Sequence, residues 1–215
     1  MKKKNTIIFD FDGVIANSLD IKVDVAAKII NQMGIKFDSM NKSSIKELIR
    51  TKGYLWLLKK IKFPFYKIPS LLSRMNLEQS KHNDKINIVP SIKNVLEKLS
   101  KNNRILMLTG NNEDFIKSFL DRYRITNFFE KIYSDKKVKG KENVFEEFFT
   151  ENLVDINKTF YVGDEISDIT NSKKYKIKSI ACTWGLTSSE NLVKSSPDFI
   201  ANKPSEIYKY IIGSK

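Results

Sequence analysis

Five short, largely apolar segments recur along the chain, and from about residue 90 onward they alternate with helical patterns. They cover residues 6–9, 104–109, 131–134, 159–163 and 179–183, and Asp, Thr, Ser or Gly closes each of them. Segments this short and this rich in apolar and β-branched residues are typical of strands buried on both faces. We therefore predict a parallel sheet, because parallel sheets bury nearly all of their strands.

Amphipathic helical patterns fill the spaces between these segments. Three of them place apolar residues on one face, namely Ile92, Val95, Leu96 and Leu99; Phe115, Ile116, Phe119 and Leu120; and Val144, Phe145, Phe148 and Phe149. Right-handed crossovers between parallel strands put such helices on both faces of the sheet. The sequence predicts an α/β fold with a doubly wound, Rossmann-like parallel sheet, whose ligand site lies at the carboxyl ends of the strands.

The stretch between the first and second strands, about residues 19–87, breaks this alternation. It contains helical patterns over residues 19–33, 43–52 and 54–61 and no convincing strand. Gly34, Gly53 and Pro64 follow these patterns, and glycine or proline after a helix is a common stop signal. We predict an α/β core formed by residues 1–18 and 88–215 and an inserted helical domain formed by residues 19–87.

An aromatic-rich stretch within the insert admits two interpretations. Its apolar residues are Leu55, Trp56, Leu58, Phe63, Phe65 and Tyr66, and they alternate with Lys59, Lys60, Lys62 and Lys67. In the first interpretation the stretch forms a small helical core with a basic, solvated face. In the second, part of it faces the active site and selects the substrate.

The single cysteine and the single histidine narrow the chemistry. Because Cys182 is the only cysteine, an intrachain disulfide and a cysteine-built zinc site are excluded, and we expect a buried, inert thiol. His82 is the only histidine and lies in a polar stretch, so a Ser-His-Asp triad is not expected. Carboxylates are the remaining candidates for catalysis.

The net charge of +13 would suit a phosphate-rich partner. The lysines are scattered through every segment, however, and no arginine-rich or aromatic-interleaved patch stands out, so a nucleic acid is not expected as a partner. The apolar run near the start covers only residues 7–9, far less than the apolar core of a signal peptide. No apolar stretch approaches the roughly 20 residues of a membrane helix, and we expect a cytoplasmic protein without a membrane partner.

Two carboxylates, Asp10 and Asp12, directly follow the first predicted strand and are separated by one residue. They therefore fall at the carboxyl end of the sheet, where Gly13 allows close approach of the backbone. Two acids at this spacing are suited to holding a hard cation while one of them acts as a nucleophile. A single carboxylate at this point could equally cap a helix.

Residues 10–18, with the sequence DFDGVIANS, resemble the first motif of the haloacid dehalogenase superfamily, and in particular of its phosphoglycolate phosphatase-like branch. In that family the first Asp attacks phosphorus and forms an aspartyl-phosphate, while the second protonates the leaving oxygen and later activates water. The resemblance implies these catalytic roles for Asp10 and Asp12. It also implies that the insert is a helical cap, and it extends through residues 179–186 and 197–200.

Two further segments resemble the family motifs that bind phosphate. Thr109, Gly110 and Asn111 end the second predicted strand, and a hydroxyl followed by a glycine amide is a compact set of donors for a phosphate oxygen. Such a turn alone would be a common connection, but the resemblance implies substrate binding. The third motif is a lysine that neutralises the nucleophile and the phosphoryl group. Lys141 fits this catalytic and phosphate-binding role best because it precedes a predicted helix, and Lys139 is the alternative.

Asp164 and Asp168 follow the strand at residues 159–163, and their spacing places both carboxylates on one side of a helical turn. An acidic loop after a strand is often only a helix cap. The segment nevertheless resembles the fourth family motif, whose acids hold Mg²⁺, with Asp164 as the direct ligand. The resemblance implies a magnesium site formed by Asp10, Asp12, Asp164 and Asp168, and Mg²⁺ suits such a set because it prefers oxygen ligands.

Together these features predict a magnesium-dependent phosphatase that acts on a small phosphorylated metabolite through an aspartyl-phosphate. Phosphoglycolate, a sugar phosphate or a nucleotide would fit, because no motif in the insert identifies the substrate, and the oligomeric state is not indicated. A phosphomutase or phosphotransferase of the same superfamily is one alternative, and a non-catalytic binding protein of this fold is the other. Dehalogenation is disfavoured because that reaction needs no acid at the position of Asp12.

Overall fold

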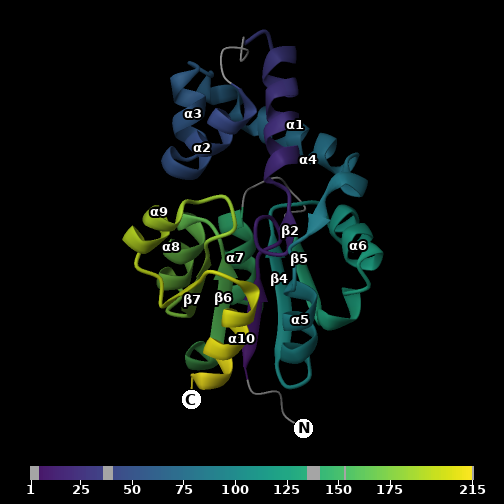
Figure 1. The fold of residues 1–215 in the computed structure, drawn as a ribbon, viewed down its shortest axis with the longest axis vertical. Helices are drawn as coiled ribbons and strands as arrows, with labels where there is room; N and C mark the ends of the chain where they lie inside the picture. The colour runs from purple at the N-terminus through teal and green to yellow at the C-terminus, as the bar shows by residue number, and fades with distance from the viewer. Residues whose placement is uncertain (1–4, 36–40, 135–140, 153, 215) are drawn as a thin grey trace.

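A six-stranded parallel sheet forms the centre of the computed structural model, which describes residues 5–35, 41–134, 141–152 and 154–214 (Figure 1). Its strand order is β5-β4-β1-β6-β7-β8. The strands are β1 (Thr6–Phe9), β4 (Arg104–Thr109), β5 (Lys131–Ser134), β6 (Thr159–Gly163), β7 (Lys178–Cys182) and β8 (Phe199–Ala201). Every adjacent pair is parallel, which confirms the predicted doubly wound α/β sheet with β1 between its two halves.

Helices cover both faces of this sheet, because alternate residues of a strand point to opposite sides. The helices of the core are α5 (Ile92–Ser100), α6 (Glu113–Arg122), α7 (Lys141–Glu151), α8 (Ile166–Lys174), α9 (Ser189–Lys194) and α10 (Pro204–Gly213). On one face, α5, α6 and α10 pack on side chains that include Ile7 and Phe9 of β1. On the other face, α7 packs on Ile8, and α8 and α9 pack on Ala181 of β7.

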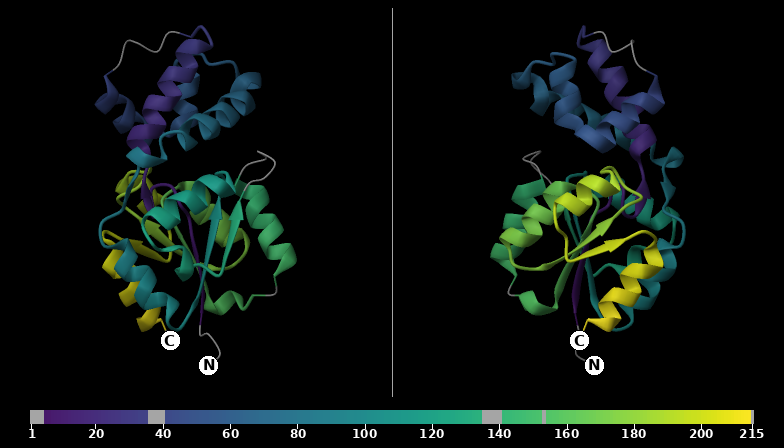
Figure 2. Two further views of the ribbon diagram at one scale, coloured as in Figure 1. Left: turned by 90° about the vertical axis from the view of Figure 1, so that its right-hand side faces the viewer. Right: turned by 60° about the vertical axis from the view of Figure 1, so that its left-hand side comes forward.

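A helical insert lies beyond the carboxyl ends of the strands, at the top of Figure 1 and in both views of Figure 2. It consists of α1 (Leu19–Gln32), α2 (Lys42–Lys52), α3 (Tyr54–Lys60) and α4 (Ile68–Ser80). These helices bury a separate apolar cluster of their own. The short strands β2 (Ala16–Asn17) and β3 (Asn87–Ile88) pair antiparallel where the chain enters and leaves the insert.

The aromatic-rich stretch of the insert divides between core and surface. Leu58 and Phe63 are buried in the cluster of the insert, whereas Phe65 and Tyr66 are among the exposed apolar side chains. In the core domain the thiol of Cys182 is buried, as predicted, and this burial raises its pKa well above the ordinary value. Among the described helices, none combines the length and the apolar character that crossing a membrane requires.

Phe11, which separates the two carboxylates that follow β1, anchors their loop to the core. It is fully buried and makes edge-to-face contacts with Phe115 and Phe119 of α6, at ring-centroid distances of 5.7 Å and 4.9 Å. Aromatic pairs favour this geometry. The loop that carries Asp10 and Asp12 is therefore held by the packing of α6 on the sheet.

Replacing Phe119 with alanine should lower the free energy of unfolding by about 3–5 kcal/mol, because it leaves a cavity against Phe11. Phe65→Ala is the matched control, since the Phe65 side chain is 63% exposed and its loss should change stability by no more than about 0.5 kcal/mol. Urea unfolding followed by circular dichroism measures both. Equal stability of the two variants would contradict the proposed anchoring.

Candidate active site

Asp10 lies at the carboxyl end of the central strand and is 5% exposed. Its backbone N–H continues the sheet by donating to the carbonyl oxygen of Val162, at 2.9 Å. Its Oδ1 accepts a hydrogen bond from the backbone N–H of Phe11 at 2.7 Å, and its Oδ2 accepts one from Nζ of Lys141 at 2.6 Å. The sheet and the lysine together fix the direction of this carboxylate.

Lys141, the first residue of α7, bridges two carboxylates. Besides Asp10, its Nζ contacts Oδ1 of Asp168 at 2.5 Å. Burial acts to lower the pKa of Lys141, but the carboxylates of Asp10 and Asp168 outweigh it and hold the pKa well above its ordinary value. The ammonium therefore stays charged. Lys139, the alternative for this role, lies outside the described residues.

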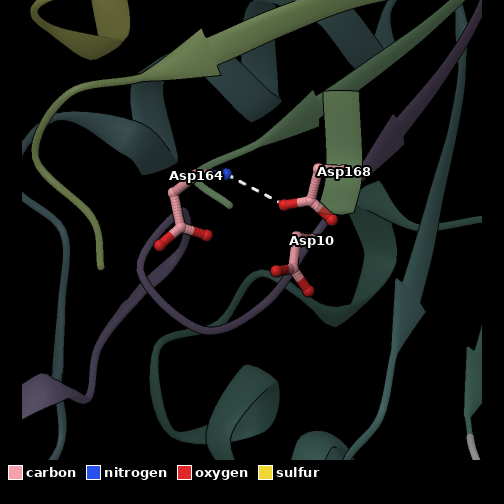
Figure 3. Close-up of side chains that lie close together, drawn as sticks. All are labelled: Asp10, Asp164 and Asp168. Atoms are coloured by element: carbon pink, nitrogen blue, oxygen red, sulfur yellow. Dashed lines mark hydrogen bonds between the residues drawn. The ribbon is translucent and has the colours of Figure 1, made fainter. Parts of the chain in front are cut away.

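Asp10, Asp164 and Asp168 form an acidic cluster, shown in Figure 3. Each offers an oxygen atom, and these atoms lie within 4.8 Å of one another. Oδ2 of Asp168 accepts hydrogen bonds from the backbone N–H groups of Asp164 and Glu165, at 3.0 Å and 3.1 Å. Asp168 thereby orients the loop that presents Asp164.

Asp164 occupies a space that glycines create. A Cβ atom at Gly13, whose φ is +74°, or at Gly185 would overlap its carboxylate. Oδ2 of Asp164 accepts a hydrogen bond from the backbone N–H of Leu186 at 2.6 Å, whereas its Oδ1 is buried and has no hydrogen-bond partner among the described residues. One carboxylate oxygen is thus left available to a ligand.

The acidic cluster fits a divalent cation that prefers oxygen. Burial, reinforced by the charge of Asp10, raises the pKa of Asp164 well above its ordinary value, and burial raises the pKa of Asp10 to about 7. Buried carboxylates this close require protons or a cation. The free oxygen of Asp164, together with Asp10, matches the one or two carboxylates through which proteins bind Mg²⁺. The side chain of Asp12 is not part of this cluster, so its assignment as a metal ligand stays a prediction.

Asp12 instead accepts hydrogen bonds from the core and from the insert. Its Oδ1 contacts Oγ of Ser18 at 2.5 Å and Nε2 of Gln79 at 3.1 Å, and its Oδ2 accepts a hydrogen bond from Nδ2 of Asn111. Oδ2 also pairs with Nζ of Lys22 at 2.9 Å. Burial would raise the pKa of Asp12, but Lys22 and the hydrogen-bond donors hold it below its ordinary value.

Lys22 of α1 and Gln79 of α4 are candidate site residues that the sequence analysis missed. A third is Asn76 of α4, whose Nδ2 donates to the carbonyl oxygen of Gly110 at 3.2 Å. The position of Lys22 in the helix that follows the first motif was a signal for its proximity to Asp12. Nothing in the sequence analysis pointed to Asn76 or Gln79, because α4 was not predicted.

A cavity of about 190 Å³ lies between Asp10, Asp12 and the end of β4. Its walls include all the residues predicted to act on the phosphate, namely Asp10, Asp12, Thr109, Gly110, Asn111 and Lys141. Thr109 is buried, and its Oγ1 accepts hydrogen bonds from the backbone and the side-chain amide of Asn111, at 3.2 Å and 3.1 Å. We refer to this space as the catalytic cavity.

The fold and the cavity define a class of α/β proteins, in which carboxylates and a lysine line a cavity beneath a helical insert. The chain belongs to the haloacid dehalogenase-like hydrolase family, whose model matches residues 7–182. This membership agrees with the resemblance seen in the sequence.

Individual relatives are distant but extend over nearly the full chain. A phosphoglycolate phosphatase from Synechococcus elongatus is 22% identical over 206 residues, which are 95% of this chain and 96% of the relative. A predicted phosphatase from Clostridium acetobutylicum superimposes with a TM-score of 0.83 at 19% identity, over 99% of this chain and all of the other. A haloacid dehalogenase-like hydrolase from Streptococcus pneumoniae gives a TM-score of 0.78 at 21% identity, over 96% and 97% of the two chains. The two structures share the fold of this chain.

Magnesium should stabilise the native protein through the acidic cluster. At about 100 times its Kd, Mg²⁺ should raise the thermal unfolding midpoint by about 5–10 °C, because it binds the folded state alone. Asp164→Asn should lose most of this shift, and Asp84→Asn, at an exposed position, should retain it. Scanning calorimetry with and without Mg²⁺ tests this, and a full shift in Asp164→Asn would contradict the assignment.

Proposed function

We propose that this hydrolase is a magnesium-dependent phosphatase that cleaves a small phosphate monoester through an aspartyl-phosphate on Asp10. The observation that carries the proposal is the contact between the Asp10 carboxylate and the Lys141 ammonium, in a cavity shared with Asp12 and Thr109. The names of the relatives from Synechococcus and Clostridium, both phosphatases, also support it. A small phosphorylated metabolite is the expected partner.

The phosphate group would be held by hydrogen-bond donors at the end of β4 and by Lys141. Thr109, Gly110 and Lys141 border the catalytic cavity. The Thr109 hydroxyl, the backbone N–H of Gly110 and the Lys141 ammonium can donate to phosphate oxygens. Asp10 and Asp164, with Asp168 beside them, would hold Mg²⁺, which shields the phosphoryl charge from the nucleophile and stabilises charge on its oxygens.

In the first step a carboxylate oxygen of Asp10 attacks phosphorus, and the bond from phosphorus to the alcohol oxygen breaks. Asp12 gives its proton to the departing alcohol oxygen. Lys22 favours the ionised form of Asp12, but a phosphate dianion nearby raises the pKa of a carboxyl group and favours its protonation. Binding of the substrate therefore prepares Asp12 to act as an acid.

In the second step Asp12, now ionised, takes a proton from water as the water oxygen attacks phosphorus. The bond between phosphorus and Asp10 breaks, which restores the Asp10 carboxylate and releases inorganic phosphate. The insert, which we assign to residues 19–87, acts as a cap that excludes bulk water during the first step. Lys22 and Gln79 of the insert contact Asp12. Closure of the cap and the state of the catalytic acid are therefore linked.

Asp10→Asn should lower kcat for hydrolysis of p-nitrophenyl phosphate in the presence of Mg²⁺ by at least about 10³-fold, because the amide is a poor nucleophile. Asp84→Asn, which changes an exposed acid, should keep full activity. Activity that survives in Asp10→Asn would overturn the mechanism. Turnover that depends on an added sugar acceptor would instead indicate a phosphotransferase, and a lack of turnover on p-nitrophenyl phosphate and on a metabolite panel would indicate a binding protein.

Lys22→Met should lower kcat/KM by about 10–100-fold, because Asp12 loses a charged hydrogen-bond donor from the cap. Removing this cation raises the pKa of Asp12, so the limb of the kcat/KM profile that reports Asp12 should move to higher pH. The matched control is Lys28→Met, since Lys28 lies on the same helix and pairs with Glu78 of the insert. A limb that moves to lower pH, or equal losses in both variants, would contradict this role.

A further inference from the structure

A second cavity, of about 510 Å³, lies between the insert and the core beside the catalytic cavity. From its size and lining we infer that the preferred substrate is a phosphate monoester whose alcohol carries an uncharged hydrophobic body of ring size or larger, rather than glycolate. The inference rests on the proposed phosphatase function and narrows its substrate class. We refer to this space as the cap cavity.

The cap cavity adjoins the catalytic cavity. Lys22, Leu72, Asn76, Glu165 and Leu186 line both of them. A phosphoryl group next to Asp10 in the smaller space would therefore direct the rest of its ester into the larger one. The leaving alcohol, and not the phosphate, is the part of the substrate that the cap cavity contacts.

The volume of the cap cavity exceeds what a two-carbon acid fills. Cavities of about 300–1,000 Å³ commonly hold ligands of drug size, and the 510 Å³ found here fall within that range. Glycolate would leave most of this volume to water, so contacts with the insert would add little to its recognition. A ring or a longer chain would fill more of the cavity and contact more of its lining side chains.

Most of the surface that lines the cap cavity is apolar, although charged side chains such as Lys52 and Glu165 also line it. Those of the insert come from all four of its helices and include Val23, Ile49, Tyr54, Leu55, Leu72 and Met75. Leu55 is 63% exposed and Leu72 is 42% exposed, although both belong to this concave surface. Exposed leucines in a cavity are typical of a site that buries an apolar ligand.

The charges at the junction of the two cavities disfavour a carboxylate close to the phosphate. Among the described residues that line both cavities, Lys22 is the cation, and it is already paired with Asp12. Glu165 adds a negative charge at the same junction. Arg50 and Lys52 line the cap cavity but not the catalytic cavity, and Arg50 donates to the carbonyl oxygen of Thr183 at 3.2 Å. A carboxylate as close to the phosphate as that of phosphoglycolate would lie at the junction, where it would compete with Asp12 for Lys22.

Benzyl phosphate and 2-phosphoglycolate test the inference, because both are alkyl esters and they differ in the body of the alcohol. With the native protein and Mg²⁺, kcat/KM should be at least about tenfold higher for benzyl phosphate. An equal or higher kcat/KM for phosphoglycolate would overturn the inference and leave the phosphatase proposal standing.

Leu55→Ser should reduce the ratio of the two kcat/KM values by about tenfold, since it removes apolar surface from the cap cavity. Leu77→Ser is the matched control, because Leu77 is 66% exposed on α4 and lines a different surface depression, together with Lys28 and Arg74. An unchanged ratio in Leu55→Ser would count against the cap cavity as the site that binds the alcohol.

Binding separates failure of this inference from failure of the proposed function. The phosphatase proposal fails only if the protein also hydrolyses neither p-nitrophenyl phosphate nor the compounds of a metabolite panel. Whenever neither of the two esters is hydrolysed, calorimetric titration of both into the native protein with Mg²⁺ decides which class of ester the site prefers. Tighter binding of benzyl phosphate would support the hydrophobic site. Equal or tighter binding of phosphoglycolate, or no binding of either ester, would overturn it.

Discussion

The ammonium group of Lys141 balances the charges on which the site depends. It lies between Asp10 at the end of the central strand and Asp168 of α8, and it donates a hydrogen bond to each. Without it, the three carboxylates of the buried acidic cluster would lose the ammonium that pairs with two of them, and burial would then favour their protonation. The lysine begins α7, and α7 is fixed by Phe145 and Phe148, which are buried against one face of the sheet. Packing of the core thus positions the charge that the chemistry needs.

Asp10 and Asp12 are separated by one residue, but their carboxylates have different partners. Asp10 contacts the core through Lys141, and burial raises its pKa to about 7. Asp12 contacts the insert through Lys22 and Gln79, and despite burial its pKa is held below the ordinary value. Different environments give neighbouring carboxylates different roles. In the proposed mechanism a divalent cation beside Asp10 would lower its pKa and keep it ionised, as a nucleophile requires. The contacts from the insert would control the protonation of Asp12.

Local patterns were sufficient for five of the six strands of the central sheet, whereas β8 and the helices α8, α9 and α10 were not predicted from such patterns. The predicted bounds of β1, β4, β5 and β6 match the structure, and β7 begins one residue earlier than predicted, because short apolar runs and the residues that close them carry the signal. The motifs that follow these strands also come together, although Lys141 and Asp10 are 131 residues apart. The sequence analysis missed α4, and with it Asn76 and Gln79. The contact between Gln79 and Asp12 could not be predicted, because it spans 67 residues and depends on how the insert docks on the core. The orientation of Lys22 toward Asp12 and the shape of the cap cavity likewise arise from this docking.

A crystal structure of the protein with Mg²⁺ and trifluoroberyllate, a mimic of a phosphoryl group on a carboxylate, tests the central claim most directly. The account predicts beryllium bonded to a carboxylate oxygen of Asp10, fluorine atoms against Thr109 and Lys141, and Mg²⁺ bound by Asp10 and Asp164. Beryllium bonded to another residue, or Mg²⁺ bound away from the acidic cluster, would contradict it.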